Sequence, residues 1–492
     1  MRKVIDLQME FWKKDIANVE FDLESRDEIP KLLMGLQYIY STPAIREKVF
    51  NVLKQVVPKK SYESGRPGMD LWKILVLATL RLNCNWDFDK VHEMANNHYK
   101  LRQMLGHRET DFESNYPLQT IRDNIALLTP PILDEVNQIV VKAGHSIISP
   151  DKDPQLRGSC DSFVVETDVH YPTDTNLLFD AMRKMISLIA IICSEVGITA
   201  WRQSHHNILK VKRLLRGVQK LRRSTSKDEA KRQKRDEFII AKHQHYIDVC
   251  QGLVIRVKET IHILRELGIL SMSQELRLIT IEEYIRHAER QIDQICRRVV
   301  FDEKIPHREK VFSIFQPHTE WISKGKVSAP VELGHKVLIT TDQDSLILDY
   351  KVMTQSSDVQ ETLPLADRLL TRFGEGRLQS WSVDKGFSAQ QDRDLLELFI
   401  PEVIMPKKGR RSHADLERET QKSFRRLQRQ HSGIESNINA LEHHGLNRCP
   451  DKGWSGFQRY VGLGVLAYNL HKIGNRLLAQ DRQRQPRLKH AA

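Results

Sequence analysis

Two aspartates stand beside short apolar runs that are typical of buried strands. Asp161 follows Cys160 at the start of the segment CDSFVVETDVHYPTD, and Asp384 ends the apolar run in LQSWSVDKGFS. An unpaired carboxylate at a buried strand is unfavourable unless it binds a cation. Each aspartate alone is also compatible with a turn residue at the strand's end. Together they indicate hard oxygen ligands for divalent metal ions, which is the chemistry that phosphodiester cleavage or transfer requires.

The elements that must position these carboxylates alternate between strand and helix patterns. A strand is predicted over 157–169, followed by a long all-helical segment from 176 to about 300 whose apolar residues recur at helical spacing. Strands are predicted again at 331–341 and 345–353, joined by a hairpin at 342–344. The sequence therefore predicts an α+β or α/β fold, with strands that flank a helical insertion.

The C-terminal third continues this alternation. We expect a helix over 363–373, a strand over 380–384, and a helix that runs to Phe399 behind a capping box made by Ser388 and Gln391. Further helices are predicted over about 413–442 and 462–478. Residues 5–144 are punctuated and helical, as in a small bundle suited either to helix-turn-helix DNA binding or to a purely structural role.

The charge balance favours a polyanionic partner. The 492-residue chain has a formal net charge of +12 and a pI of about 9.3, and cationic side chains bind DNA by releasing its condensed counterions. The stretch from Arg202 to Lys242 is especially rich in Lys and Arg, which predicts either a DNA-tracking surface or the solvated face of helices.

The cysteines and the apolar runs exclude other classes of protein. Six cysteines are scattered with no C-x-x-C pair, which argues against a zinc ribbon and against a disulfide framework. The N-terminus is interrupted by charges, so it does not read as a secretory signal, and no apolar run approaches roughly 18 residues. These features predict a cytoplasmic protein of a reducing compartment that does not cross a membrane.

Several segments together resemble the insertion-sequence DDE transposases of the ISNCY and related groups. The resemblance spans nearly the whole chain and rests on five segments in order, which are GRPGMDLWKILVLATLRL (65–82), CDSFVVETDVHYPTD with LLFDAMRK (160–184), KVFSIFQPHTEWISKGK (310–326), SWSVDKGFS (380–388) and HSGIESNINALEHHGLNRCPDKG (431–453). It implies an RNase H-like catalytic core of mixed sheet that binds Mg²⁺ or Mn²⁺. It also implies action on the terminal inverted repeats of a mobile element.

The resemblance carries the catalytic, metal-binding triad onto Asp161, Asp384 and Glu435. Glu166 and Asp168 are rivals for the first position. Because side chains alternate along a strand, Asp161 and Glu166 should point to opposite faces. Asp161 is preferred since the family pattern begins there.

Glu435 lies in a predicted helix, one turn from His431 and from Asn439, downstream of the basic run FRRLQRQ. Related transposases often place a Tyr, an Arg and a Lys around this glutamate, where this chain has Gln428, His431 and Glu442. His318, Lys324 and Lys326 are candidates for phosphate contacts, although a lone histidine is more often structural. Trp321 and Trp454 suit core packing better than stacking on a base.

The predicted domains are a DNA-binding bundle (1–150), the first part of the core (151–175), the helical insertion (176–305), the rest of the core (306–478) and a basic tail (479–492). We expect a transposase that uses two Mg²⁺ or Mn²⁺ ions to cleave and join double-stranded DNA. It would act as a homodimer or larger assembly, in the cytoplasm and on the nucleoid. The alternative is an inactive, transposase-derived DNA-binding protein.

Overall fold

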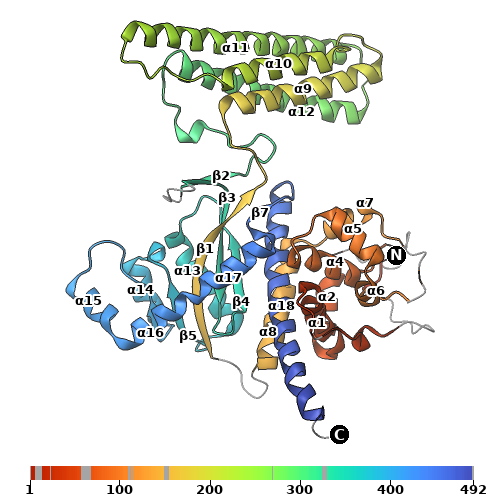
Figure 1. Ribbon diagram of the computed structural model, residues 1–492, viewed down its shortest axis with the longest axis vertical. Helices are drawn as coiled ribbons and strands as arrows, with labels where there is room; N and C mark the ends of the chain where they lie inside the picture. The colour runs from red at the N-terminus through yellow and green to blue at the C-terminus, as the bar shows by residue number, and fades with distance from the viewer. Residues whose placement is uncertain are drawn as a thin grey trace. The chain divides into compact units, whose positions relative to one another are not determined.

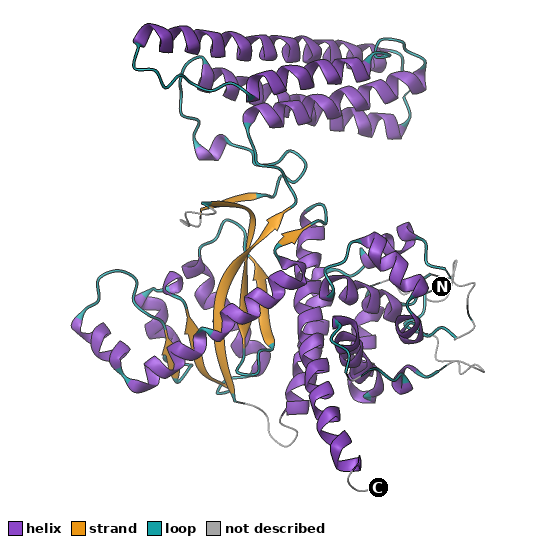
Figure 2. Cartoon of the chain, viewed as in Figure 1, coloured by secondary structure: helices purple, strands orange, loops and turns teal. Residues whose placement is uncertain are grey.

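The computed structural model describes residues 2–5, 14–22, 24–56, 68–108, 111, 115–148, 155–268, 270–323 and 330–489, with side chains as far as 484. Two compact units contain the chain, one built from 1–168 and 322–492 and the other from 169–321. Figures 1 and 2 trace these elements and show the strands gathered in one sheet. None of the helices within the described ranges is long and apolar enough to cross a membrane.

A mixed sheet forms the centre of the first unit. Its main strands are β1 (Leu156–Thr167), β3 (Val331–Thr341), β4 (Ile347–Val352), β5 (Leu378–Val383) and β6 (Glu402–Ile404). They lie in the order β4-β3-β1-β5-β6. The pairs β4/β3 and β3/β1 are antiparallel, whereas β1/β5 and β5/β6 are parallel. Two short strands, β2 (Glu320–Ser323) and β7 (Arg448–Cys449), complete the sheet.

Alternation along β1 buries both faces of the sheet. Phe163 and Val165 pack into the same apolar cluster as residues of α8 (Pro130–Ile148), α17 (Gly433–Leu441) and α18 (Trp454–Lys489). Cys160 belongs to a second cluster, which includes Leu365 and Leu369 of α13 (Asp358–Phe373). The sheet is therefore held between two helical layers.

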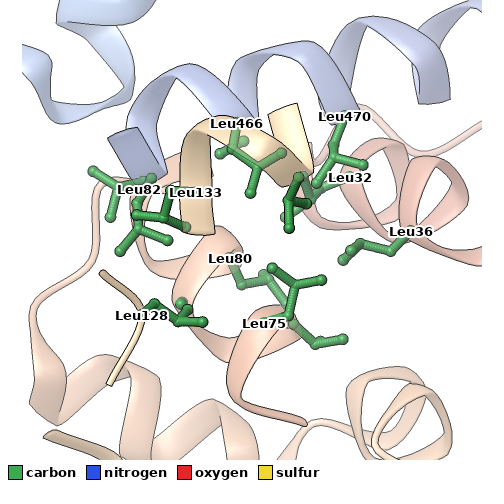
Figure 3. Packing of buried hydrophobic residues seen from close by; sticks show 14 of the residues in the cluster. Leu32, Leu36, Leu75, Leu80, Leu82, Leu128, Leu133, Leu466 and Leu470 are labelled. Atoms are coloured by element: carbon green, nitrogen blue, oxygen red, sulfur yellow. The ribbon is translucent and has the colours of Figure 1, made fainter. Parts of the chain in front are cut away.

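The N-terminal helices share the core of α18. They are α1 (Glu28–Ser41), α2 (Pro43–Lys54), α4 (Leu71–Asn83), α5 (Phe88–Asn97), α6 (Tyr99–Met104) and α7 (Leu118–Ile125). Figure 3 shows the leucines that interlock here, from Leu32 and Leu36 to Leu466 and Leu470. Gly35 and Gly474 stand where α1 and α18 cross. A Cβ at Gly474 would lie 1.7 Å from the Lys31 carbonyl oxygen, so only glycine allows this approach.

The second unit is a helical insertion with a core of its own. It contains α9 (Asp174–Val196), α10 (Ser204–Gln219), α11 (Glu229–Glu266) and α12 (Met272–Val299). Helix α12 begins with a capping box between Ser271 and Gln274. The predicted helical segment after the first strand is confirmed.

The α+β class and the main strands agree with the sequence predictions, and several boundaries do not. Strand β3 has the predicted bounds. The prediction of a capping box made by Ser388 and Gln391 is wrong. Helix α14 (Gln390–Leu396) begins after Ala389, and no side chain caps it.

The predicted helix over 413–442 is three helices, α15 (His413–Thr420), α16 (Lys422–His431) and α17, because the chain breaks at Gln421 and Ser432. The last helix is α18, which starts earlier and ends later than the predicted 462–478. The sequence pattern missed β6 altogether, since three residues are too few to show a period.

Candidate functional site

The parallel pairing of β1 with β5 places Asp161 beside Asp384. The register aligns Cys160 with Val383, and each aspartate is the next residue in its chain. Neighbouring strands lie about 4.8 Å apart, so the two carboxylates leave the sheet from adjacent positions. Asp161 is half-buried, and Asp384 is exposed at the end of its strand. Strand register thus unites two residues 223 positions apart in sequence.

Glu435 joins this pair from the first turn of α17. Ile434 and Ile438 anchor that helix in the core, which leaves Glu435 exposed. Burial raises the pKa of Asp161 to about 6, against a hydrogen bond of 2.7 Å from the Ser162 backbone N–H. The charges of Asp384, Glu435 and Asp358 contribute to this rise. The three predicted carboxylates therefore act on one another, as ligands of a shared cation site must.

The rival carboxylates point elsewhere and have a cationic partner. Arg448 donates to Glu166 at 3.0 Å and lies 3.7 Å from Asp168. Asp161 and Glu166 occupy positions of opposite parity on the same strand, as predicted from the alternation. Asp161 is thus the residue of this segment that lies with Asp384.

His431 ends α16 beside the carboxylates. Its Nδ1 lies 3.1 Å from the hydroxyl of Ser382 on β5. Burial lowers the pKa of His431, and the nearby charges of Asp384 and Glu435 oppose that change. The histidine thus fixes α16 against the strand that carries Asp384.

A fourth carboxylate, Asp358, lies close to the same strand. It accepts hydrogen bonds from the Ser162 hydroxyl at 3.1 Å and from Lys336 at 2.8 Å. Its charge acts on Asp161, and a Cβ at Gly386 would lie 3.3 Å from its Oδ2. Asp358 was not among the predicted site residues, because the helix was expected to start at Leu363. The signal was the capping box of Ser357 and Gln360, which begins α13 at Asp358.

A basic helix face precedes Glu435. Arg425, Arg426 and Arg429 of α16 are exposed, while Phe424 and Leu427 are buried on the opposite side. Within the described part of the chain none of these three arginines pairs with a carboxylate. Guanidinium groups that face solvent on the helix before Glu435 suit a substrate that is itself an anion.

The remaining predicted contact residues have structural partners or lie outside the described residues. His318 lies 3.1 Å from the Gln316 side-chain oxygen. Lys324 and Lys326 fall outside the described ranges. Trp321 packs against Phe312 with ring centroids 5.5 Å apart, and Trp454 stacks on Phe457 at 6.1 Å. Both tryptophans are packed, as expected.

The His-Tyr-Pro-Thr-Asp run builds the entry to the insertion. Thr173 caps α9 by accepting a hydrogen bond from the Asn176 N–H. Asp174 accepts from Arg298 at 2.7 Å, and His170 pairs with Asp180 at 2.6 Å. The run thus positions α9 against α12. In the insertion, the basic stretch forms an exposed face of α10, which includes Lys210, Lys212, Arg213 and Arg216.

A second cluster of ligand-type residues lies in the first unit. Glu28, His444 and His471 bring one ligand atom each to within 4.8 Å of one another. They form the only such triple in the described ranges, so the Asp161, Asp384 and Glu435 oxygens span a wider space. Burial lowers the pKa of His471 to about 4.

All six cysteines are free, in agreement with the absence of a disulfide framework from the sequence pattern. Comparison of the chain with protein-family models, with curated proteins and with solved structures finds no match.

Proposed function

We propose that this protein is a DDE-type transposase that cleaves DNA at the ends of a mobile element and joins them to target DNA. One observation carries the proposal. Asp161 and Asp384 leave adjacent parallel strands side by side, and the charge of Glu435 reaches them from α17. Three hard carboxylates in one charge cluster are suitable ligands for Mg²⁺ or Mn²⁺.

The strand order supports an RNase H-like core. Three antiparallel strands in the order β4-β3-β1, followed by the parallel strands β5 and β6, give the arrangement that the family resemblance implies. In that scheme the first two acidic residues come from β1 and the end of β5. The third comes from a helix after the last strand, which is where Glu435 lies.

The residues present fit a divalent cation. Burial and neighbouring charges raise the pKa of Asp161, and a bound cation would offset this clustered negative charge. Asp161, Asp384 and Glu435 would hold the ions. When bound, two ions align the attacking and leaving oxygens of a phosphodiester and offset the charge of the transition state. The protein's part is to fix these ligands on rigid strands.

The basic groups would hold the substrate. The exposed Arg425, Arg426 and Arg429 of α16, the helix before Glu435, would contact DNA phosphates. The exposed basic face of α10 is a second surface that would contact DNA phosphates. Neither surface identifies a base sequence, so the recognition of terminal repeats is assigned to the N-terminal helices. Joining two element ends requires two copies of the protein or more.

The deciding experiment is an Mg²⁺-dependent nicking assay on the DNA that flanks the open reading frame. We expect nicking at the inverted repeats by the wild-type protein and none by Asp384→Asn, which should still shift the same DNA. Asp367→Asn, an exposed aspartate of α13, is the matched control and should cut normally. A protein that binds this DNA and never cuts it in Mg²⁺ or Mn²⁺ would instead be the non-catalytic DNA-binding alternative.

A further inference from the structure

A site distinct from the carboxylate cluster brings two histidines and a glutamate together. Glu28 is the first residue of α1, His444 lies in the short π-helix η4 (Glu442–Leu446), and His471 lies on α18. Their ligand atoms lie within 4.8 Å of one another. Glu28 is more than 400 positions from both histidines in the chain, and all three residues belong to one compact unit.

Asn83 contacts the Nδ1 atom of both imidazoles. His444 Nδ1 hydrogen-bonds to the Asn83 backbone oxygen, which can only accept, so Nδ1 must carry the proton. His471 Nδ1 lies 2.8 Å from Asn83 Oδ1. The Asn83 amide is oriented by its own donor, Nδ2, which lies 3.1 Å from the Glu28 carbonyl oxygen. Both imidazoles therefore hold Nδ1–H, and in the neutral form each Nε2 bears a lone pair.

This arrangement leaves acceptors facing one another. His471 Nε2 lies 3.2 Å from Glu28 Oε2, and two lone pairs at that distance repel unless a cation lies between them. In metalloproteins a ligating histidine usually donates its other N–H to a fixed oxygen, which sets the tautomer and orients the ring. Asn83 supplies such an oxygen to both histidines, its backbone oxygen to His444 and its Oδ1 to His471. The residue is about 1% exposed.

The backbone also holds the site in shape. His444 departs from helical geometry and is followed by Gly445 at a φ of 102°. A Cβ at Gly445 would lie 2.7 Å from Asn85 Oδ1, so no other residue fits without movement. The Lys31 ammonium donates a hydrogen bond to Glu28 Oε1 at 3.0 Å, and the other carboxylate oxygen, Oε2, faces His471.

From this geometry we propose that Glu28, His444 and His471 form a binding site for Zn²⁺ or a similar transition-metal ion. Imidazole nitrogen suits zinc better than magnesium, and two histidines with one carboxylate leave a fourth position for water. At metal–ligand bonds of about 2.0–2.1 Å, neighbouring tetrahedral ligands lie roughly 3.3 Å apart. The distance from Nε2 of His471 to Oε2 of Glu28 is 3.2 Å, which agrees.

The bound ion would connect α1 of the N-terminal bundle to α18 and to η4, because each of these elements supplies one ligand. Helix α17, which carries Glu435, runs directly into η4. Zinc would thus fix the helix of the third carboxylate against the N-terminal helices. The proposal of a zinc site does not depend on the proposed transposase activity, because it is argued only from the contacts of Glu28, His444 and His471.

The test uses the full-length protein after chelation and dialysis, with Zn²⁺ alone as the probe. We expect one tightly bound zinc per chain, and Co²⁺ in its place should give the visible absorption bands of a four-coordinate site. His471→Ala and Glu28→Gln should each weaken zinc binding by more than about 100-fold. His443→Ala, the exposed neighbour, is the control and should bind as the wild type does.

Two further measurements keep the proposal falsifiable. Saturating zinc should raise the melting temperature of the wild type by about 5 °C and leave that of Glu28→Gln unchanged. The variant Asp161→Asn/Asp384→Asn/Glu435→Gln should retain the zinc, which separates this site from the carboxylate cluster. Equal zinc binding by the wild type, His471→Ala and Glu28→Gln, or none by the wild type, would mean that a proton alone bridges the pair.

Discussion

Asp161 and Asp384 lie one residue beyond the last aligned pair of two parallel strands, Cys160 and Val383. Successive residues of neighbouring parallel strands stay in step, so both carboxylates occupy the same level of the sheet. Aspartate is unfavourable at such a place without a partner. The pKa of Asp161, raised to about 6 by burial and by the charges around it, reflects that cost.

Removing the third carboxylate tests its share in the reaction. Glu435→Gln should lower Mg²⁺-dependent cleavage on the order of 1,000-fold, because a metal ligand is lost while α17 keeps its buried residues Ile434 and Ile438. The measurement is single-turnover cleavage at saturating DNA. Glu417→Gln, an exposed glutamate of α15, is the matched change and should have no effect. Full activity in Glu435→Gln would place the third ligand elsewhere.

The raised pKa of Asp161 predicts a pH-dependent gain in stability when its charge is removed. The folded pKa exceeds the usual value, so the folded state binds the proton more tightly and loses stability as pH rises from about 4 to about 6. Asp161→Asn should stabilise the metal-free protein at pH 7.5 by about 1–3 kcal/mol, and by roughly half as much at pH 5.

Thermal unfolding of both proteins at the two pH values measures this difference. Saturating Mg²⁺ should reverse it, since only the wild type gains from the cation. A stability difference that ignores both pH and Mg²⁺ would show that Asp161 does not carry an under-compensated charge.

The basic face of α16 should contribute to DNA affinity through phosphates. The triple change Arg425→Ala/Arg426→Ala/Arg429→Ala should weaken binding and reduce the slope of log K against log salt by up to about 2.7, at roughly 0.9 per phosphate contact. Phe424 and Leu427 stay in place, so the helix should still pack. Asp384→Asn serves as the comparison, with an unchanged slope. An unchanged slope in the triple variant would assign DNA binding to other surfaces.

The helix crossing of α1 and α18 should tolerate no side chain at its contact. Gly474→Ala should destabilise the first unit by about 2–4 kcal/mol, because its Cβ would overlap the Lys31 backbone. Gly217→Ala lies in α10 with nothing within 4 Å of the added Cβ, and it should instead stabilise the insertion by up to about 1 kcal/mol. Denaturant unfolding distinguishes the two, and equal stabilities would contradict the close crossing.

Local patterns in the sequence determined much of the architecture. Short runs of apolar and β-branched residues predicted β1 and β3, and helical spacing predicted the insertion, because these patterns depend on one element alone. The capping residues of α13 were readable too, yet the start of that helix at Asp358 was missed. The breaks within 413–442 went unseen because no glycine or proline marks the first one, at Gln421.

Only the tertiary structure decided which residues meet. Sequence alternation separates Asp161 from Glu166 by face, but the β1/β5 register and the Arg448 pairing decide which of them lies beside Asp384. The cluster of Glu28, His444 and His471 had no local signal, since Glu28 is distant in the chain from both histidines. Periodicity is a property of one element, whereas a site depends on the register and packing of several.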